Sequence, residues 1–305
     1  MQEIKISVII PHYNIPDMLV RALRSIPKRD DVQVIVVDDG SKDANKYIER
    51  YPELSASNVE FYPQPHCGSA GAMRNIGLEY AKGEWVTFVD ADDFLSDNAD
   101  KIFTEVQQYN EDIVFYRSIA VMNEDLTTPS KRNGFDSLFD IEPKEERERY
   151  FRYVYSFPIG KFVRRELITS HHIQFDDVRC WNDVYFCACI GIYAKSIRVC
   201  DDILYVITER GDSVTSDGIE NKKDRIRNNR IRLDVALRTY RLLRKHKIYM
   251  PTEAYHLNRA VGLFRTKDKL QYWGLLLKML FIFPGCTFYY IKKDVSHAFR
   301  KIIRK

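Results

Sequence analysis

The chain has 305 residues, of which 45% are hydrophobic and 30% charged, and 47 Lys and Arg stand against 43 Asp and Glu for a formal net charge of +4. This composition excludes a disordered chain, and the length allows one large α/β domain with extensions or two small domains. The six cysteines form no Cys-x-x-Cys pair, which favours reduced, packed thiols in a cytoplasmic protein over a zinc site.

The first 117 residues alternate short apolar, β-branched runs with amphipathic segments, a pattern typical of buried strands and covering helices. Strands are predicted at residues 5–10, 32–37, 59–62, 84–89 and 112–117, and helices from Pro16 onward, at 70–82 and at 97–109. Asp43 is predicted to cap a helix after the second strand, and Gly83 to end the 70–82 helix as its C′ residue. The N-terminus has no basic stretch followed by an apolar one, so no secretory signal is expected.

Polar residues follow three of these strands, at residues 11–14, 38–41 and 90–93. Strands that alternate with helices predict a parallel sheet with right-handed crossovers, and such sheets bind ligands beyond the carboxyl ends of their strands. The three polar clusters are therefore expected to converge on one edge of the sheet.

The rest of the chain is less regular. Residues 118–150 are expected to form a polar connection, with a charged helix over 145–155. A mixed α and β pattern follows over 157–216, and the chain is predicted to be helical beyond Asp224.

Asp90, Asp92 and Asp93 place three carboxylates at the end of one predicted strand, where they repel one another. Mg²⁺ or Mn²⁺ would relieve this repulsion, because both prefer hard oxygen ligands and also take phosphate oxygens and water. The alternative is a solvated acidic turn with helix-capping aspartates. The position directly after a buried strand favours the metal.

Two further features suggest nucleotide binding, each beside a simpler explanation. Asp39 could accept a hydrogen bond from a base or ribose, or cap the next helix. Tyr13 could stack on a base, or only cover the end of the sheet. Residues 66–71 are mostly small and lead into a helix N-terminus, which favours anions. The chain contains neither a P-loop nor a Gly-x-Gly-x-x-Gly fingerprint.

Seven segments within residues 4–216 occur in a recognisable order: SVIIPHYN, VVDDGS, GSAGAMRNIGLEYAKGEWVTFVDADD, IGKFVRREL, HHIQFDD, WNDVYF and LYVITERGDSVT. Taken together, they resemble the family 2 glycosyltransferases of the GT-A fold. The resemblance implies an α/β, Rossmann-like GT-A domain with a mostly parallel central sheet, followed by a helical C-terminal extension. Residues 1–117 would bind the nucleotide-sugar and residues 118–220 the acceptor, within one domain. Residues 221–305 would form a basic, helical, membrane-associating region.

The resemblance also implies roles at the donor site. Pro11 and Tyr13 would line the base pocket, with the Tyr13 ring against the nucleobase. Asp39 would hydrogen-bond that base, which is typically uracil in this family, and Arg74 would lie beside the nucleotide.

For the chemistry, Asp90 and Asp92 match the family's Asp-x-Asp motif. Asp92 is favoured as the direct metal ligand, and Asp90 would contact the ribose or sugar. Asp183 falls where the family places its catalytic base, and Arg210 and Ser213 lie in a loop expected to close near the diphosphate.

The implied function is inverting transfer of a sugar from a UDP-sugar to a hydroxyl of a glycan or lipid-linked acceptor in bacterial surface-polysaccharide assembly. The reaction would depend on Mn²⁺ or Mg²⁺, with Asp183 as general base. Asn182 departs from the family's usual Glu-Asp pair. It supports the alternative of a sugar-nucleotide-binding scaffold that has lost catalysis, whereas Asp90, Asp92 and Asp183 argue against it. A nucleotidyltransferase, which would release pyrophosphate, is a third alternative.

Residues 272–283 are apolar but contain Lys278, and Pro284 and Gly285 end the run, which is too short for a transmembrane helix. The run suits a segment that lies at the membrane interface, with the basic C-terminal tail on anionic lipid headgroups. The alternative is a pair of helices that covers the sheet or forms a homodimer contact. The family's lipid-linked acceptors favour the first, which would place the protein in the cytoplasm, on the inner face of the membrane. The basic stretch 222–247 carries no nucleic-acid-binding motif, so no nucleic-acid partner is expected.

Overall fold

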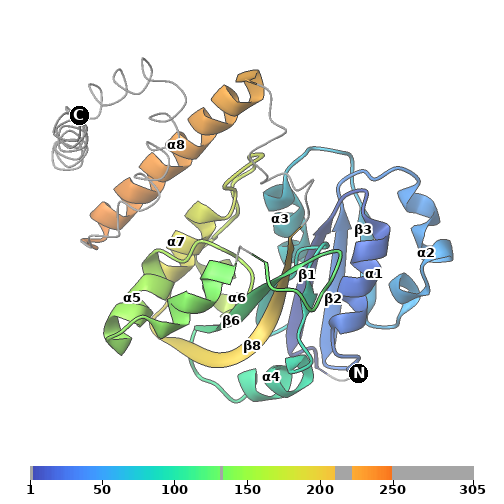
Figure 1. Ribbon diagram of the computed structural model, residues 1–305, viewed down its shortest axis with the longest axis horizontal. Helices are drawn as coiled ribbons and strands as arrows, with labels where there is room; N and C mark the ends of the chain where they lie inside the picture. Colours follow the sequence, from blue (N-terminus) through green and yellow to red (C-terminus); the bar gives the residue numbers. More distant parts are fainter. Residues whose placement is uncertain (1–2, 131–132, 210–221, 249–305) are drawn as a thin grey trace, which may run out of the picture. The chain divides into compact units, whose positions relative to one another are not determined.

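The computed structural model describes residues 3–130, 133–209 and 222–248 (Figure 1). The chain divides into two compact units, residues 1–231 and 232–305, and the architecture given below is that of the first.

The described residues contain one eight-stranded sheet, in the order β3-β2-β1-β4-β7-β6-β8-β5. The strands are β1 (Ile6–His12), β2 (Val32–Asp38), β3 (Val59–Pro63), β4 (Trp85–Phe88), β5 (Phe94–Leu95), β6 (Ile113–Met122), β7 (Lys161–Arg164) and β8 (Ile197–Glu209). β1 lies at the centre of the first half, and β2 and β4 pair with it in parallel on either side. β2–β3 and β6–β8 are also parallel, whereas β7 runs antiparallel to both β4 and β6. The structure confirms the α/β fold with a mostly parallel sheet.

Helices accompany the strands as the alternating pattern predicts. The α-helices are α1 (Pro16–Ser25), α2 (Tyr47–Arg50), α3 (Ala70–Tyr80), α4 (Ala99–Val106), α5 (Lys144–Tyr153), α6 (Arg165–Ser170), α7 (Val184–Tyr193) and α8 (Lys222–Lys245), and the 3-10 helices are η1 (Ala44–Lys46), η2 (Pro52–Ser55) and η3 (Asn133–Asp140). Pro16 occupies the first turn of α1, where its missing N–H costs nothing. α8 crosses the boundary between the two units.

The helices cover both faces of the sheet. α1 and α4 pack on the face that carries Ile6, Val8 and Ile10, and all of them contribute to one buried apolar cluster. α3 covers the opposite face, where Gly77 lies directly against Ile9. α7 lies on that same face, because its Phe186 packs edge-on against Phe88 of β4. α7 is almost entirely apolar, as expected of a helix buried on nearly every side.

Three sequence predictions were wrong in detail. Asp43 makes no capping hydrogen bond; it has a left-handed backbone (φ 57°) and pairs with Lys46 instead. Gly83 is not the C′ residue of α3, which ends at Tyr80. Strand β6 continues to Met122, so the segment after 117 is not wholly a connection.

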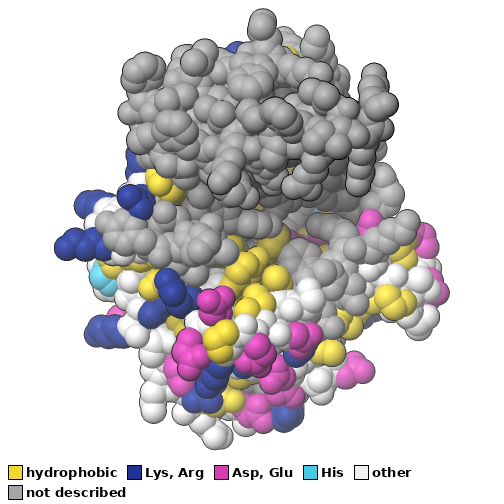
Figure 2. Space-filling view, turned by 60° about the vertical axis from the view of Figure 1, so that its left-hand side comes forward, with side chains coloured by type: hydrophobic (Ala, Val, Ile, Leu, Met, Phe, Trp, Pro, Cys, Tyr) yellow, Lys and Arg dark blue, Asp and Glu magenta, His cyan; other side chains and the backbone are white. Residues whose placement is uncertain are grey.

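The charged outer face predicted for residues 145–155 belongs to α5, where Lys144 pairs with Glu148 at 3.7 Å. Figure 2 brings forward the side of the molecule on which α5 lies in Figure 1. Lys, Arg, Asp and Glu side chains are interspersed on its lower part, without a large region of one sign. Phe151 is the fully buried residue of α5, so one side of the helix packs inward and the other is solvated.

Gly83 is required by a close approach of two backbone segments. A Cβ atom at this position would lie 2.5 Å from the Ser7 nitrogen and 2.8 Å from the Trp85 carbonyl oxygen. The Ser7 hydroxyl also accepts a hydrogen bond from the Gly83 nitrogen at 2.9 Å, which ties this turn to β1.

We expect Gly83→Ala to lower the free energy of unfolding by about 3 kcal/mol, because neither backbone can move away without breaking the sheet. Denaturant unfolding measures this effect. Lys82→Ala is the matched control, since its exposed ion pair with Glu60 contributes at most about 1 kcal/mol. Equal stability of the two variants would contradict the close-packing explanation.

Candidate active site

The three polar clusters predicted from the sequence meet at one edge of the sheet. β1 pairs with β2 so that His12 stands opposite Asp38, and with β4 so that Ile9 stands opposite Phe88. The segments that follow these strands therefore leave the sheet side by side. This confirms the expected convergence at the carboxyl ends of the parallel strands.

Tyr13 and Asp39 lie on neighbouring loops of this edge. Tyr13 is 45% exposed, and its ring stacks on that of His66 with 4.4 Å between centroids. Asp39 is buried, and its carboxylate accepts hydrogen bonds from the backbone nitrogens of Cys67 (2.7 Å) and Gly68 (2.9 Å). His66 Nδ1 also donates to the Asp39 carbonyl oxygen at 2.8 Å. Three loops are thereby joined around Asp39.

His66 was not singled out by the sequence analysis. Its only signal there was an aromatic residue at the start of the small-residue segment 66–71. In the structure it covers one face of the Tyr13 ring, the residue predicted to stack on a nucleobase. Pro11, the other residue predicted to line the base pocket, is half-buried within β1.

Arg74 is buried and joins the acidic turn after β4 to the segment before α7. Its Nη2 donates to Asp90 Oδ1 at 2.6 Å, and its Nη1 donates to Asn182 Oδ1 at 3.1 Å. The guanidinium also lies over the Phe175 ring, 5.4 Å from its centroid. Arg74 is thus a buried cation that orients Asp90 and Asn182 through one hydrogen bond to each.

The three carboxylates after β4 have different environments. Asp93 points inward, where its oxygens accept hydrogen bonds from the Thr208 nitrogen (2.7 Å) and the Tyr205 hydroxyl (2.9 Å). Burial, followed by the charges of Asp92 and Asp90, raises the pKa of Asp93 well above its ordinary value. Asp93 therefore connects the acidic turn to β8 and is not one of three equivalent metal ligands.

Asp90 and Asp92 are the two partly exposed carboxylates of the cluster. The Asp92 carbonyl oxygen accepts hydrogen bonds from Arg21 and, at 2.5 Å, from the Thr208 hydroxyl, which fixes the turn. Among the described residues, no group of three or more His, Cys, Asp and Glu is placed to hold a metal ion. A pair of carboxylates still fits a magnesium-like ion, since such ions commonly take one or two carboxylates together with substrate phosphates and water.

Asp183 stands directly before α7, on the acceptor side predicted from the sequence. Its side chain is only partly exposed and makes no capping hydrogen bond to the helix, unlike an ordinary N-cap aspartate. Burial raises the pKa of Asp183 to about 6; the positive charge of Arg74 opposes this shift, and the negative charge of Asp90 adds to it. A carboxylate that titrates near neutral pH suits a general base.

One buried side chain near Asp183, that of Lys161, was not singled out by the sequence analysis. Lys161 is buried, with Nζ 5.0 Å from the ring centroids of both Phe115 and Tyr155 and 3.6 Å from Cys187 Sγ. Burial lowers the pKa of Lys161, and the nearby Asp183 opposes this shift. The one signal in the sequence was a lysine directly before the apolar pair Phe162 and Val163.

Three aromatic residues that flank Asp183 in the sequence lie in different environments. Phe186 is fully buried and stacks on Phe175 with 3.8 Å between centroids, so it belongs to the core. Trp181 and Tyr185 are partly exposed.

Several predicted residues lie outside the described part of the chain. Arg210 and Ser213 fall within 210–221, and the apolar run 272–283 falls within 249–305. In the part of the chain that is described, no helix is both long and apolar enough to cross a bilayer.

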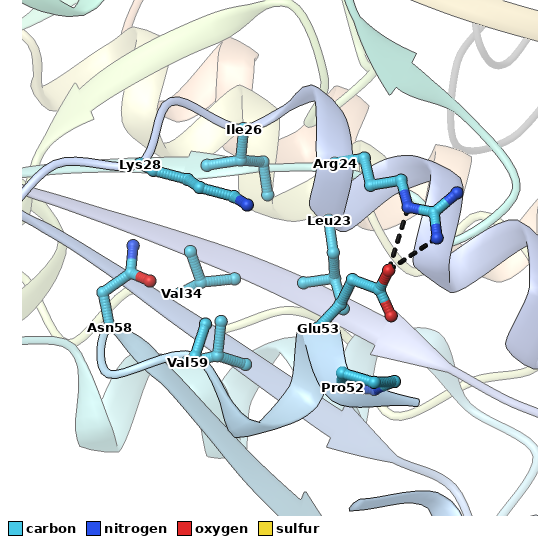
Figure 3. Close-up of a pocket in the computed structure, with 10 residues that line it drawn as sticks. Leu23, Arg24, Ile26, Lys28, Val34, Pro52, Glu53, Asn58 and Val59 are labelled. Carbon is cyan, nitrogen blue, oxygen red and sulfur yellow. Dashed lines mark hydrogen bonds and ion pairs between the residues drawn. The ribbon is translucent and has the colours of Figure 1, made fainter. Parts of the chain in front are cut away.

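Two cavities open away from these residues. One encloses about 190 Å³ between the end of α1 and the start of β3, with Leu23, Ile26 and Val34 on its walls and Arg24 hydrogen-bonded to Glu53 at its rim (Figure 3). The other, of about 490 Å³, is lined by α6 and by residues that precede strands, such as Glu84 before β4 and Asp112 before β6. No predicted site residue lines either cavity.

Comparisons with known proteins point to one family. The model of the family described as "Glycosyl transferase family 2" matches residues 7–170, more than half of the chain. Glycosyltransferase GlyG of Streptococcus pneumoniae is 26% identical over 223 residues, which are 68% of this chain and 72% of GlyG. A β-1,3-glucosyltransferase of Campylobacter jejuni, named for the substrate GalNAc(5)-diNAcBac-PP-undecaprenol, is 30% identical over 146 residues, 46% of this chain and 47% of that protein.

The poly(ribitol-phosphate) β-N-acetylglucosaminyltransferase TarS of Staphylococcus aureus is 28% identical over 211 residues, 66% of this chain but 35% of TarS. The crystal structure of TarS residues 1–349 with UDP-GlcNAc superposes with a TM-score of 0.65 at 23% identity, over 88% of this chain and 77% of that one. This likeness establishes a shared GT-A fold. The family match, the fold and the carboxyl-end site together show that this chain is a glycosyltransferase that belongs to glycosyl transferase family 2.

Proposed function

We propose that this protein is an inverting, metal-dependent glycosyltransferase that moves a sugar from a UDP-sugar to a hydroxyl of a glycan or lipid-linked saccharide. The observation that carries the proposal is the arrangement of Asp183, a partly buried carboxylate with a pKa of about 6, beside the Arg74–Asp90 pair of the acidic turn. A base with a suitable pKa thus stands next to the carboxylates proposed to face the donor.

The donor is proposed from the loops around Asp39. Asp39 is held by the backbone of residues 67 and 68, and its Oδ2 also lies 3.2 Å from His66 Nδ1, which leaves Oδ1 with a lone pair for a further hydrogen bond. Such an acceptor can bind the N3–H of uracil, with Tyr13 against the base. The UDP-GlcNAc complex of TarS, a protein with the same fold, supports a UDP-sugar.

In the proposed reaction, Asp183 takes the proton of the acceptor hydroxyl while the oxygen attacks the anomeric carbon from the side opposite the diphosphate. The bond between the sugar and the diphosphate breaks, and the configuration inverts. Arg74 holds Asp90 in place by a charge-assisted hydrogen bond. When bound at Asp92 and Asp90, Mn²⁺ or Mg²⁺ would neutralise the leaving diphosphate.

The acceptor class is proposed from the relatives, since the names of TarS and the Campylobacter enzyme contain a poly(ribitol-phosphate) and a lipid-linked saccharide. A place on the cytoplasmic face of the membrane would suit such acceptors. Membrane contact, or homodimer contact, through residues 272–305 is proposed from the sequence alone, because those residues lie outside the described ones. The amide oxygen of Asn182 accepts a hydrogen bond from Arg74, which supports an intact site over a degenerate scaffold.

Asp183→Asn is expected to reduce transfer by about 10³-fold and leave UDP affinity unchanged, because the amide cannot accept the proton. Transfer to a hydroxyl acceptor and UDP calorimetry measure the two quantities. Asp177→Asn, at an exposed carboxylate of the preceding loop, is the control.

The same variant should not be less stable than the wild type. Folding raises the pKa of Asp183, so the ionised carboxylate destabilises the fold at pH values above the pKa that it has in the unfolded chain. Asp183→Asn should therefore unfold at the same or a higher temperature at pH 7. Wild-type turnover in this variant would remove Asp183 from the role of base.

The pH dependence of kcat/KM is expected to have an acidic limb with a midpoint near pH 6. Burial raises the pKa of Asp183 to about 6, so the deprotonated, active form is lost as the pH falls through this value. Initial rates at low donor concentration across this range measure the midpoint. A flat profile from about pH 5 to pH 7 would be incompatible with Asp183 as the base.

UDP is expected to bind more tightly with Mn²⁺ than without it, and more tightly than GDP or CDP. Asp92→Asn should remove the effect of Mn²⁺ and leave metal-free binding intact, because it removes one proposed ligand. Asp97→Asn, at an exposed residue a few positions later, is the control. Calorimetry measures each affinity, and failure of the wild-type protein to bind UDP under both conditions would overturn the donor site.

A further inference from the structure

His12 closes β1 with a side chain that is fully buried. Its Nδ1 lies 2.7 Å from Asp38 Oδ1, and its Nε2 lies 3.2 Å from the backbone nitrogen of Ile15. A backbone N–H can only donate, so Nε2 must accept with its lone pair. Nδ1 therefore carries the ring hydrogen and donates it to Asp38. One imidazole thus joins the end of β2 to the first turn after β1.

A second connection joins the same two loops on the other side of Tyr13. The Asn14 backbone nitrogen donates to Ser41 Oγ at 2.7 Å, and Asn14 Oδ1 accepts from the Lys42 nitrogen at 2.9 Å. Asn14 has a left-handed backbone (φ 54°), which asparagine tolerates better than most residues. The Ser41 nitrogen in turn donates to Asp38 Oδ2 at 2.8 Å. One oxygen of Asp38 thus holds His12 of the neighbouring loop, and the other holds Ser41, the residue to which Asn14 is bonded.

Asp38 is completely buried, and a buried carboxylate is stable only when it is hydrogen-bonded. Burial by itself would raise the pKa of Asp38, but the hydrogen bonds from His12 and Ser41 outweigh it and hold the pKa below the ordinary value. The carboxylate thus stays ionised and keeps both partners bound.

The consequence is the placement of two residues of the proposed base pocket. Tyr13 is exposed, yet the residues on both sides of it are anchored. The Asp39 nitrogen donates to the His12 carbonyl oxygen at 2.8 Å, so Asp39 is set by the same contacts. A ring that is held in its binding position loses little entropy when a ligand stacks on it.

We propose that His12, Asn14, Asp38 and Ser41 form a clamp whose role is to position Tyr13 and Asp39 for the nucleobase of the donor. His12 and Asn14 are positioning residues in this clamp and do not touch the sugar or the acceptor. The inference rests on the proposed function, because it takes the base of a UDP-sugar as the ligand.

The first test compares two exposed residues that both have a left-handed backbone. Asn14→Gly keeps that conformation and removes the side-chain bond to Lys42, whereas Asp43→Gly (φ 57°) makes the same replacement outside the clamp. Asn14→Gly should raise the Kd of UDP and the KM of the donor about fivefold, with kcat within about twofold of wild type. Asn14→Gly should also lower the ratio of the Kd of CDP to the Kd of UDP. Asp43→Gly should change none of these values.

The second test concerns His12. His12→Asn retains a donor near the position of Nδ1, and His12→Ala removes both hydrogen bonds. We expect the Kd of UDP to rise in the order wild type, His12→Asn, His12→Ala, with at least about a tenfold rise for the last. Thermal unfolding establishes that each variant is folded. If the His12 variants do not fold, the comparison of Asn14→Gly with Asp43→Gly decides alone.

The outcomes separate the clamp from the proposed function. A wild-type protein that does not bind UDP would overturn both. A wild-type protein that binds UDP, with an Asn14→Gly variant indistinguishable from Asp43→Gly, would overturn the clamp alone. A loss of kcat without a change in donor KM would also contradict it, because the clamp acts on binding of the base.

Discussion

The parallel pairing of β1 with β2 and β4 is the constraint on which the site depends. Parallel strands end at the same edge of the sheet. Backbone pairing alone therefore brings together residues that are far apart in sequence, and no contact between their side chains is required. The pairing also positions α3, whose Gly77 lies so close to Ile9 that a Cβ atom would be 2.4 Å from the Ile9 Cγ2. That close contact holds α3 against β1, and α3 carries Arg74 to Asp90. A backbone register thus determines where the buried cation of the site stands.

The acidic turn after β4 shows how position assigns different chemistry to identical side chains. Asp93 is buried and hydrogen-bonded to β8, which makes it part of the scaffold. Asp90 is paired with Arg74 through Oδ1, and its side chain is 34% exposed. Asp92 is anchored by its carbonyl oxygen, which accepts hydrogen bonds from Thr208 and Arg21, and the residue is partly exposed. Only the last two suit a role toward a ligand.

Sequence patterns could predict the strands, most helices and the edge where the site lies, because these follow from local periodicity and from general rules of parallel sheets. They could not predict contacts that depend on packing between distant segments. Gly83 resembles a helix terminator in sequence, but it is required by the backbone of β1. His66 stacks on Tyr13, and Lys161 is buried beside Cys187, through contacts between distant segments. The resemblance to the Asp-x-Asp motif set Asp90 and Asp92 apart from Asp93, but only the structure shows that Asp93 is buried and hydrogen-bonded to β8.

Asn182 illustrates how a departure from the family pattern can be consistent with the chemistry. Arg74 carries one positive charge and directs it to Asp90, while the neutral amide of Asn182 uses a second N–H without neutralising that charge. A carboxylate at position 182 would compete for the same cation and add a negative charge next to Asp183. Both changes would oppose ionisation of Asp183, whose pKa burial has already raised to about 6. An amide therefore keeps the neighbouring carboxylate within reach of deprotonation near neutral pH, and the charge balance around Arg74 makes Asn182 compatible with the role proposed for Asp183.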